Sequence, residues 1–242
     1  MTRSRQIAFL ADRLRPGAAL GLLLTVQLAV LVTLGVAFRA VLDDVTENDE
    51  LISLDAPVSG FLIDAREPWL SRFFEVFTWS GSPAVLFLLV LLVGLYLRRV
   101  TGSHRPLIFL ATGLVGAMTA NTLIKLVVAR PRPPTFLALV DAVGYGFPSG
   151  HATAAVAGWL SMAVVFAART PRRGLKAVLV STALVIAGLV GLSRVYLGVH
   201  EPTDVLGGWS LGALWVVALL VATRLLGLRA GWTAAAAGRS RT

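Results

Sequence analysis

The chain has 242 residues and a formal net charge of +9; 56% of its residues are hydrophobic and only 14% are charged. A soluble domain usually carries about 25% charged residues, and here the few charges gather between long uncharged stretches. This distribution indicates a polytopic membrane protein rather than a soluble one. The basic residues form no continuous face with interleaved aromatics, so nucleic acid is not an expected partner. The absence of cysteine excludes disulfides, thiolate metal sites and a cysteine nucleophile.

Apolar runs long enough to cross about 30 Å of hydrocarbon occur six times along the chain. They cover residues 17–38, 73–97, 106–128, 151–168, 175–196 and 203–228. The first follows four arginines and could be a signal peptide. It is long for that role and shows no small-residue cleavage site, so we interpret it as a retained helix. The sequence therefore predicts an all-α fold, in which residues 1–242 form a single membrane domain with a bundle of six transmembrane helices.

Two further features of the apolar runs predict local geometry. Pro83 lies inside the second run, where it indicates either a kink or the first turn of a helix. Glycines in the third and fifth runs are expected to let neighbouring helices approach closely. These glycines are Gly113, Gly116, Gly188 and Gly191.

A short amphipathic helix is predicted between the first two spans. Val58, Phe61, Leu62 and Ala65 recur at i, i+3, i+4 and i+7, which is the spacing of one helix face. Such a helix could lie in the membrane interface or cover one end of the bundle, and the pattern fits both arrangements.

The charges between the spans alternate in sign and predict the orientation. Both ends of the chain are basic, as are the connections at residues 98–105 and 169–176. The segment between the first two spans is acidic, and its part from Asp43 to Glu50 is most simply a solvated loop. Its acidic residues are Asp43, Asp44, Glu47, Asp49, Glu50 and Asp55. The positive-inside rule then places both termini in the cytoplasm and the acidic segment on the outer face of the cell membrane.

Polar groups interrupt the apolar ends of the spans at three places, all of them on the predicted outer side. Residues 125–133 close the third span, residues 147–151 open the fourth, and residues 193–204 join the fifth to the sixth. Charged residues near the hydrocarbon are costly and usually mark a functional site. Their shared depth predicts that they form one site.

These groups contain what a phosphoryl-transfer site needs. Lys125, Arg132 and Arg194 supply fixed positive charge, and the planar fork of arginine suits two phosphate oxygens at once. Ser149 and Gly150 open the fourth span, where free backbone N–H groups can hold an anion.

The same groups supply two histidines and an aspartate. His151 and His200 can act as nucleophile or acid near neutral pH. Asp204 follows His200 by four residues, so its carboxylate can reach back to a ring nitrogen, fix the tautomer and stabilise the imidazolium. The neighbouring arginines and lysine would repel a divalent cation, and the ligand spacings of known metal motifs are missing. We therefore expect no metal and no cofactor.

Together the three groups resemble the signature of the phosphatidic acid phosphatase type 2 superfamily. They read Lys-x6-Arg-Pro from Lys125, Pro-Ser-Gly-His at residues 148–151, and Ser-Arg-x5-His-x3-Asp from Ser193. The order and spacing agree at every signature position, and the resemblance covers a phosphatase core at residues 70–228. Arg130 lies outside the signature, and we interpret it as contacting lipid head groups or solvent.

The resemblance implies a metal-free reaction in two steps. His200 would attack phosphorus and form a phosphohistidine, while His151 would protonate the leaving oxygen and then activate water. Asp204 would orient His200. The remaining signature residues would bind the phosphoryl oxygens and offset the charge of the transition state. These phosphate-binding residues are Lys125, Arg132, Ser149, Gly150 and Arg194.

The implied substrate is a lipid phosphate or diphosphate whose tail stays in the bilayer. Three lipids fit: undecaprenyl diphosphate, phosphatidic acid and phosphatidylglycerol phosphate. The substrates typical of the family favour the polyprenyl diphosphate. A transporter or flippase that only binds lipid phosphate would not need His151, His200 and Asp204, and the sequence lacks the internal symmetry typical of transporters. A phosphotransferase would carry the same motifs as a hydrolase. The predicted function is an integral membrane lipid phosphatase with its site on the periplasmic or extracellular side.

Overall fold

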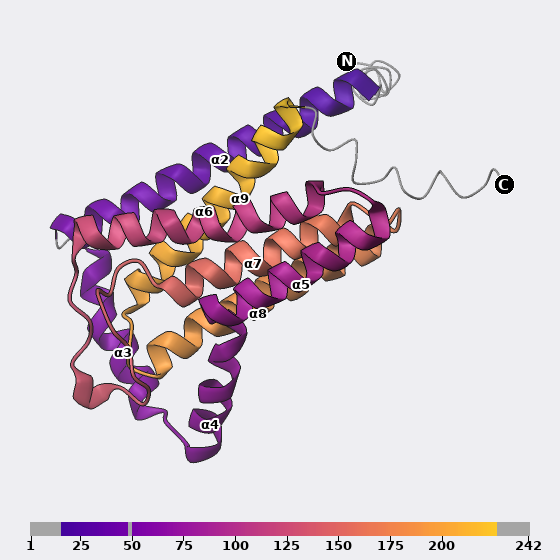
Figure 1. Ribbon diagram of the computed structural model, residues 1–242. Helices are drawn as coiled ribbons and strands as arrows, with labels where there is room; N and C mark the ends of the chain where they lie inside the picture. Colours follow the sequence, from indigo (N-terminus) through magenta and orange to yellow (C-terminus); the bar gives the residue numbers. More distant parts are fainter. Residues whose placement is uncertain (1–15, 48–49, 227–242) are drawn as a thin grey trace, which may run out of the picture.

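A computed structural model describes residues 16–47 and 50–226 (Figure 1). The basic residues expected at the two ends, from Arg3 to Arg15 and from Arg229 to Arg241, lie outside the described residues. Six helices of the described chain are long and apolar enough to cross a membrane. They are α2 (Pro16–Glu47), α5 (Pro83–Thr101), α6 (Arg105–Val128), α7 (Gly150–Ala167), α8 (Arg173–Tyr196) and α9 (Pro202–Leu225). The predicted fold class, an all-α bundle of six membrane-spanning helices, is confirmed.

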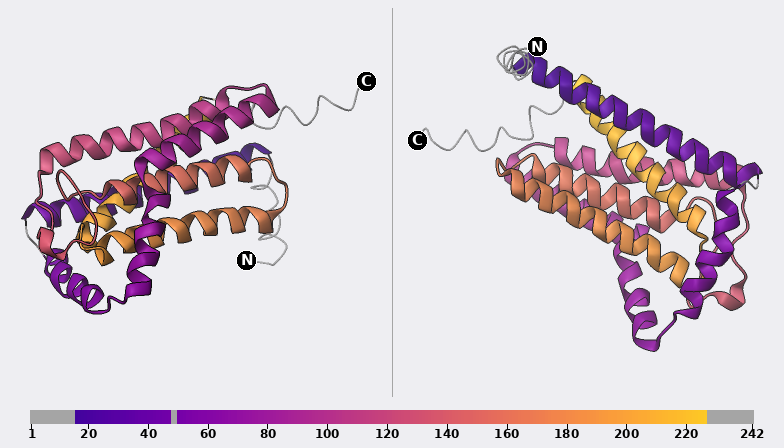
Figure 2. Two further views of the ribbon diagram at one scale, coloured as in Figure 1. Left: turned by 60° about the horizontal axis from the view of Figure 1, so that its bottom comes forward. Right: turned by 180° about the vertical axis from the view of Figure 1, so that it is seen from behind.

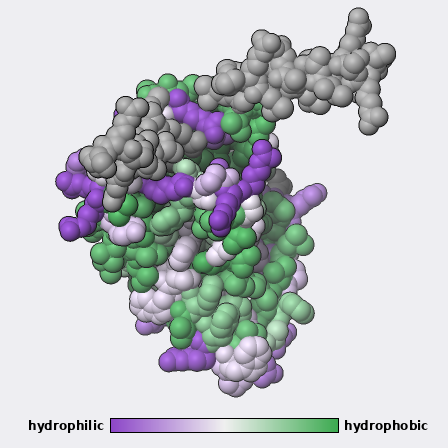
Figure 3. Space-filling view, turned by 90° about the vertical axis from the view of Figure 1, so that its right-hand side faces the viewer, coloured by the Kyte–Doolittle hydropathy of each residue, from purple (hydrophilic) through white to green (hydrophobic). Residues whose placement is uncertain are grey.

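Helix α7 lies in the middle of the bundle and packs against α5, α6, α8 and α9, while α2 lies along α9 (Figures 1 and 2). The largest hydrophobic core forms where α5, α6, α7 and α9 meet. Its fully buried members include Leu86, Leu110, Leu114, Val165 and Val216. Apolar side chains also cover much of the molecular surface (Figure 3), as expected when the surrounding solvent is hydrocarbon.

Small residues set the distance between α7 and α9. A Cβ atom built on Gly208 would lie 2.7 Å from the carbonyl oxygen of Ser149, and one on Gly212 would lie 2.8 Å from that of Thr153. Both neighbours are backbone atoms of α7 or its N-cap, so they cannot rotate away. Only glycine allows the two helices to approach this closely.

The four glycines singled out in the sequence divide into two groups. A Cβ on Gly113, Gly116 or Gly191 would come within 2.1–2.6 Å of a neighbouring side chain, so the expected close approach is confirmed there. At Gly188 the expectation is wrong, because a Cβ would meet nothing within 4 Å. It borders an apolar hollow that Val156 of α7 and Trp209 of α9 also line.

The second span begins later than the predicted residue 73. Residues 73–81 belong instead to α4 (Pro68–Phe77) and the 3-10 turn η2 (Thr78–Gly81), and the spanning helix α5 starts at Pro83. Ser82 is extended, with φ −59° and ψ 127°, as a residue before proline prefers to be. Pro83 therefore marks a first turn, and α4 projects from the bundle at an angle to α5 (Figure 1).

Helix α2 runs on to Glu47 rather than ending at residue 38. Its last turns carry Val41 and Val45, which pack with the fully buried Phe147 of the α6–α7 connection. Asp44 is also buried, and its carboxylate accepts hydrogen bonds from the main chain of Leu51 and Ile52 at 3.0 and 2.9 Å. The interpretation of residues 43–50 as a solvated loop is therefore wrong for Asp44.

The predicted amphipathic helix is present as α3 (Asp55–Asp64), preceded by the 3-10 turn η1 (Leu51–Leu54). Leu62 packs on a small core formed by α7, α8 and α9, so α3 covers one end of the bundle. Phe61 points outward and is 72% exposed. Another short 3-10 turn, η3 (Thr135–Leu137), lies in the connection between α6 and α7 at the same end. We call this end, which carries α3 and η3, the site end.

The substitution Gly208→Ala is expected to lower the free energy of unfolding by about 1–3 kcal/mol, because the added methyl group overpacks the α7–α9 contact. Thermal unfolding in detergent, followed by circular dichroism, would show a lower midpoint. Gly188→Ala is the matched control: its methyl group meets no neighbour, and alanine is the better helix former, so its midpoint should stay or rise. Equal midpoints for the two variants would contradict the role assigned to Gly208.

Candidate active site

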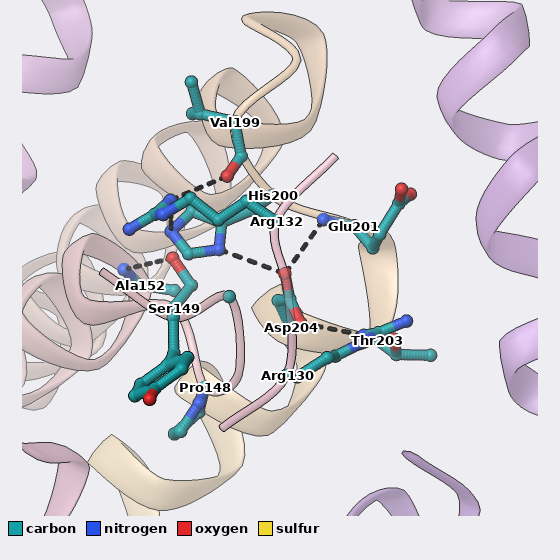
Figure 4. Close-up of polar contacts among 12 residues, drawn as sticks. Arg130, Arg132, Pro148, Ser149, Ala152, Val199, His200, Glu201, Thr203 and Asp204 are labelled. Carbon is teal, nitrogen blue, oxygen red and sulfur yellow. Dashed lines mark hydrogen bonds and ion pairs between the residues drawn. The ribbon is translucent and has the colours of Figure 1, made fainter. Parts of the chain in front are cut away.

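The three polar groups of the sequence meet at the site end (Figure 4). The end of α6 and the connection after it carry Lys125 and Arg132, and α7 begins directly after Ser149. Helix α8 carries Arg194 in its last turn, and the short α8–α9 connection carries His200.

His200 and Asp204 form a buried pair. His200 is 2% exposed and Asp204 is fully buried, and His200 Nδ1 lies 3.1 Å from Asp204 Oδ2. The main-chain N–H of Glu201 also donates to Asp204 Oδ2, at 3.1 Å, and completes the capping box that starts α9. The carboxylate is thus oriented by the same contacts that begin the helix.

The second ring nitrogen of His200 faces Arg132, whose Nη1 lies 3.0 Å from His200 Nε2 (Figure 4). A guanidinium can only donate hydrogen bonds, so Nε2 must accept and must carry a lone pair. The ring hydrogen therefore sits on Nδ1 and is donated to Asp204. This is the tautomer in which Nε2 can act as a nucleophile.

The charge state of His200 follows from its surroundings. Burial lowers the pKa of His200 to about 4, although the hydrogen bond and negative charge of Asp204 raise it. The positive charges of Arg132 and Arg194 lower the pKa further. The imidazole is consequently neutral at neutral pH, which keeps the lone pair on Nε2 available.

Lys125 and Arg132 are held by main-chain carbonyl groups. Both donate to carbonyl oxygens of residues 143–146, in the α6–α7 connection, over 2.7–3.1 Å. Arg132 also donates to the carbonyl of Val199 at 2.7 Å. Within the described part of the chain neither cation pairs with a carboxylate, so the positive charge of both remains available to an anion.

Arg194 is a buried cation with spare donor capacity. It is 4% exposed, and its Nη1 donates to Thr78 Oγ1 of η2 at 3.0 Å. Its Nε is buried and has no hydrogen-bond partner among the described residues. A buried guanidinium without a neighbouring carboxylate is costly, and an anionic ligand would relieve that cost.

The N-terminus of α7 supplies main-chain donors, although not all of those expected. Ser149 is fully buried and caps the helix, and its own N–H donates to the carbonyl oxygen of Asp204 at 2.8 Å. Ser149 can therefore offer an anion its hydroxyl group but not its N–H. The N–H groups of Gly150 and His151 have no partner in the described ranges and remain open.

The side chain of His151 stands in the first turn of α7. It is partly buried, and it lies close enough to Arg194, His200 and Arg132 for their charges to act on it. A cavity of about 290 Å³ adjoins the site beside Arg132 and Val199. The arrangement therefore combines a nucleophilic nitrogen, a second imidazole and several unpaired cations.

Arg130 is the site residue that the sequence interpretation missed. Its side chain is 13% exposed, and it pairs with Asp204 Oδ1 at 2.8 Å and with Asp55 Oδ2 at 2.7 Å. The expectation that Arg130 contacts head groups or solvent is therefore wrong. The only signal in the sequence was its place in Arg-Pro-Arg-Pro, next to Arg132.

Metal ligands are not grouped at this end. In residues 16–47 and 50–226 no set of three or more His, Asp or Glu side chains could hold a metal ion. His200 and Asp204, the one His–Asp pair among the described residues, are hydrogen-bonded instead to Arg132 and Arg130. The donor set and its charges suit an anion.

Comparison with known proteins finds a family model and relatives that agree with one another. Residues 106–227, about half of the chain, match the family model of the PAP2 superfamily. The chain is 34% identical over 182 residues to a phosphatidylglycerophosphatase B of Bacillus subtilis (strain 168), over 73% of this chain and 87% of that protein. It is also 34% identical over 158 residues to an undecaprenyl-diphosphatase of Sulfolobus acidocaldarius, over 63% of this chain and 66% of that protein.

A solved structure shares the fold. The crystal structure of a transmembrane PAP2-type phosphatidylglycerolphosphate phosphatase from Bacillus subtilis superposes with a TM-score of 0.75 at 29% identity. The superposition covers 81% of this chain and 96% of that one. Every signature residue lies inside residues 106–227, whereas Asp55 and Thr78 lie before them.

Tungstate, a phosphate-like oxyanion, is expected to bind at this site and raise the midpoint of thermal unfolding in detergent. At a concentration of 100 times its Kd it would stabilise the protein by about 2.7 kcal/mol. Arg194→Met keeps the size of the side chain but removes the unpaired charge, so it should lose most of this stabilisation. Sodium chloride at equal ionic strength is the control; equal stabilisation by both salts, or of both proteins by tungstate, would contradict the anion site.

Proposed function

The chain belongs to the PAP2 superfamily, and from this premise we propose that it hydrolyses a lipid phosphate or diphosphate by forming a phosphohistidine on His200. It is a multi-pass membrane protein of a family of lipid phosphate phosphatases. The observation that carries the proposal is the pair of contacts of His200: its Nε2 lies 3.0 Å from Arg132, which can only donate, and its Nδ1 lies 3.1 Å from the buried Asp204. These contacts favour the tautomer that keeps the lone pair on Nε2.

In the first step, Nε2 of His200 attacks phosphorus as the bond between phosphorus and the leaving oxygen breaks. His151, protonated in the complex with substrate, donates its proton to that oxygen and becomes neutral. The ring of His200 becomes positively charged, and the carboxylate of Asp204, 3.1 Å from Nδ1, stabilises it. Arg132 occupies Nε2 in the free protein, so its guanidinium must move onto the phosphoryl oxygens when substrate binds.

In the second step, His151 takes a proton from water, and the resulting hydroxide attacks phosphorus as the bond to Nε2 breaks. Inorganic phosphate and the neutral ring of His200 are the products. Throughout both steps the phosphoryl oxygens carry negative charge, and oriented donors stabilise it. The donors in reach are Lys125, Arg132, Arg194, the N–H of Gly150 and the hydroxyl of Ser149.

The cations of the site take the part that a divalent metal plays in many phosphatases, so we propose a metal-independent reaction. We also place the site end on the outer face of the membrane and both termini in the cytoplasm. The basic connections at residues 98–105 and 169–176, opposite the acidic α2–α3 segment, support this orientation.

The names of the relatives support a lipid substrate without choosing one. One relative is named for phosphatidylglycerol phosphate and another for undecaprenyl diphosphate. Both compounds carry a terminal phosphate on a lipid, and a site at the end of a membrane bundle can receive it while the tail stays in the bilayer. The preference for the polyprenyl diphosphate stays a prediction.

Purified protein in detergent with excess EDTA is expected to release phosphate from at least one of three lipids offered in parallel: undecaprenyl diphosphate, phosphatidic acid and phosphatidylglycerol phosphate. His200→Ala should abolish the release while the protein stays folded, because the nucleophile is gone. The ranking of rates identifies the preferred lipid. Activity in His200→Ala equal to wild type would remove the phosphohistidine, and loss of wild-type activity in EDTA that a divalent ion restores would remove metal independence.

The pH dependence of kcat/KM should show an acid limb well below 6.5, the ordinary pKa of histidine, because the pKa of His200 is lowered to about 4. Protonation removes the lone pair of Nε2, so activity is lost as the pH falls through this value; any limb at higher pH reports instead the deprotonation of His151, the proton donor. Arg132→Gln removes a charge that lowers this pKa and should move the limb to higher pH. The ionisation of the substrate is common to both proteins. A limb centred near 6.5, identical in the two, would contradict the assignment.

A further inference from the structure

Arg130 lies between two carboxylates that come from distant parts of the chain. Its Nη2 lies 2.7 Å from Asp55 Oδ2 and its Nη1 lies 2.8 Å from Asp204 Oδ1. The side chains of Arg130, Asp55 and Asp204 are 13%, 6% and 0% exposed. Ion pairs this buried are little screened by salt, and loss of one member leaves another charge buried without a partner.

Besides its ion pair with Arg130, Asp55 also accepts hydrogen bonds from the first turn of α9. Its Oδ1 accepts from the main-chain N–H of Thr203 at 2.9 Å, and its Oδ2 accepts from Thr203 Oγ1 at 2.6 Å. The N–H of Thr203 is one of those that a helix start leaves without an intrahelical partner. Asp55, at the first residue of α3, therefore caps α9 from 148 residues away, beside Asp204.

Each oxygen of Asp204 has its own partners. Oδ2 accepts from His200 and from the main chain of Glu201, and Oδ1 accepts from Arg130. Without Arg130, Oδ1 would be a buried anionic oxygen without a donor, and the carboxylate would be free to rotate or to take up a proton. A protonated or rotated Asp204 could not stabilise a positive charge on His200.

The charges of the three residues explain why Arg130 needs a second carboxylate. Arg130 with Asp204 alone would sum to zero, leaving little negative charge for His200. Asp55 adds a second negative charge, so the group Asp55–Arg130–Asp204 carries one net negative charge. The positive charge that forms on His200 during attack then balances this negative charge, and the four residues together are neutral.

On these grounds we propose that Asp55 and Arg130 are positioning residues: Asp55 holds and neutralises Arg130, and Arg130 fixes the ionised carboxylate of Asp204 against His200. The inference rests on the proposed function, since it concerns the same nucleophile. It assigns a role in the reaction to the α3 segment, which lies outside the part of the chain that matches the family model.

Asp55→Asn tests the proposal, because it keeps the shape of the side chain and removes its charge. We expect kcat to fall roughly 10- to 100-fold with KM unchanged, since substrate binding is not touched while the nucleophile is held less well. Two matched controls should keep the wild-type kcat. Asp43→Asn removes an exposed carboxylate of α2, and Ser59→Ala removes a different hydrogen bond of α3, to Oε2 of Glu201 at the N-cap of α9.

A double-mutant cycle separates positioning from a merely structural role. If Asp55 acts through Asp204, Asp55→Asn should have almost no further effect on kcat in an Asp204→Asn background. Multiplying losses in the double variant would overturn the proposal, as would a wild-type kcat in Asp55→Asn. If Asp55→Asn does not fold in detergent, Arg130→Lys takes its place in the cycle. Lysine keeps the charge but cannot bridge two carboxylates with a planar fork, so the same loss and the same non-additivity are expected.

The proposed function and this inference fail in different ways. A wild-type protein without His200-dependent phosphate release from any of the lipids would contradict the proposed function. Wild-type release that depends on His200, together with an unchanged kcat in Asp55→Asn or Arg130→Lys, would contradict only the positioning role.

Discussion

The carboxylate of Asp204 has no exposed surface, yet its burial is stable only if each oxygen finds donors. Three groups donate to it: His200 and the main chain of Glu201, both in the α8–α9 connection, and Arg130 beyond the end of α6. The ends of α6, α8 and α9 must therefore converge on one point. Arg130 in turn brings in α3 through Asp55, so the satisfaction of one buried charge determines how four helices meet.

The packing of α7 against α9 also helps to bring the site residues together. The main chain of Ser149 donates to the carbonyl of Asp204, which joins the start of α7 to the first turn of α9. That contact requires the two helices to run close together, and Gly208 and Gly212 provide the space. The helix N-terminus that can hold an anion and the carboxylate that orients His200 are thus parts of one helix pair.

The sequence predicts the spans well because long apolar runs depend only on composition. It predicts the break before Pro83 less well, since mostly apolar residues continue from Phe73 to the proline, and Pro83 by itself fits either a kink or a first turn. In the structure Ser82 is extended, and α4 packs on α8 through the rings of Phe74 and Tyr196, whose centroids lie 4.7 Å apart. Which glycines face a neighbour depends on the rotation of α8, which its composition does not fix. The site shows the same contrast. Its signature residues are recognised by spacing, whereas Arg130 and Asp55 are 75 residues apart and no periodicity joins them.

The carbonyl groups that hold Lys125 and Arg132 have a consequence for the end of the proposed reaction. To bind these two cations, a phosphate must exchange with the carbonyls of residues 143–146, whereas the N–H groups of Gly150 and His151 are already open. The contribution of Lys125 and Arg132 to its binding free energy is then the difference between two sets of hydrogen bonds, which is far smaller than the sum of the new ones. Free phosphate lacks a lipid tail that would add affinity. The same carbonyl groups can therefore re-form their hydrogen bonds to Lys125 and Arg132 once the ester is cleaved. The connection between α6 and α7 would in this way limit product inhibition and help turnover continue.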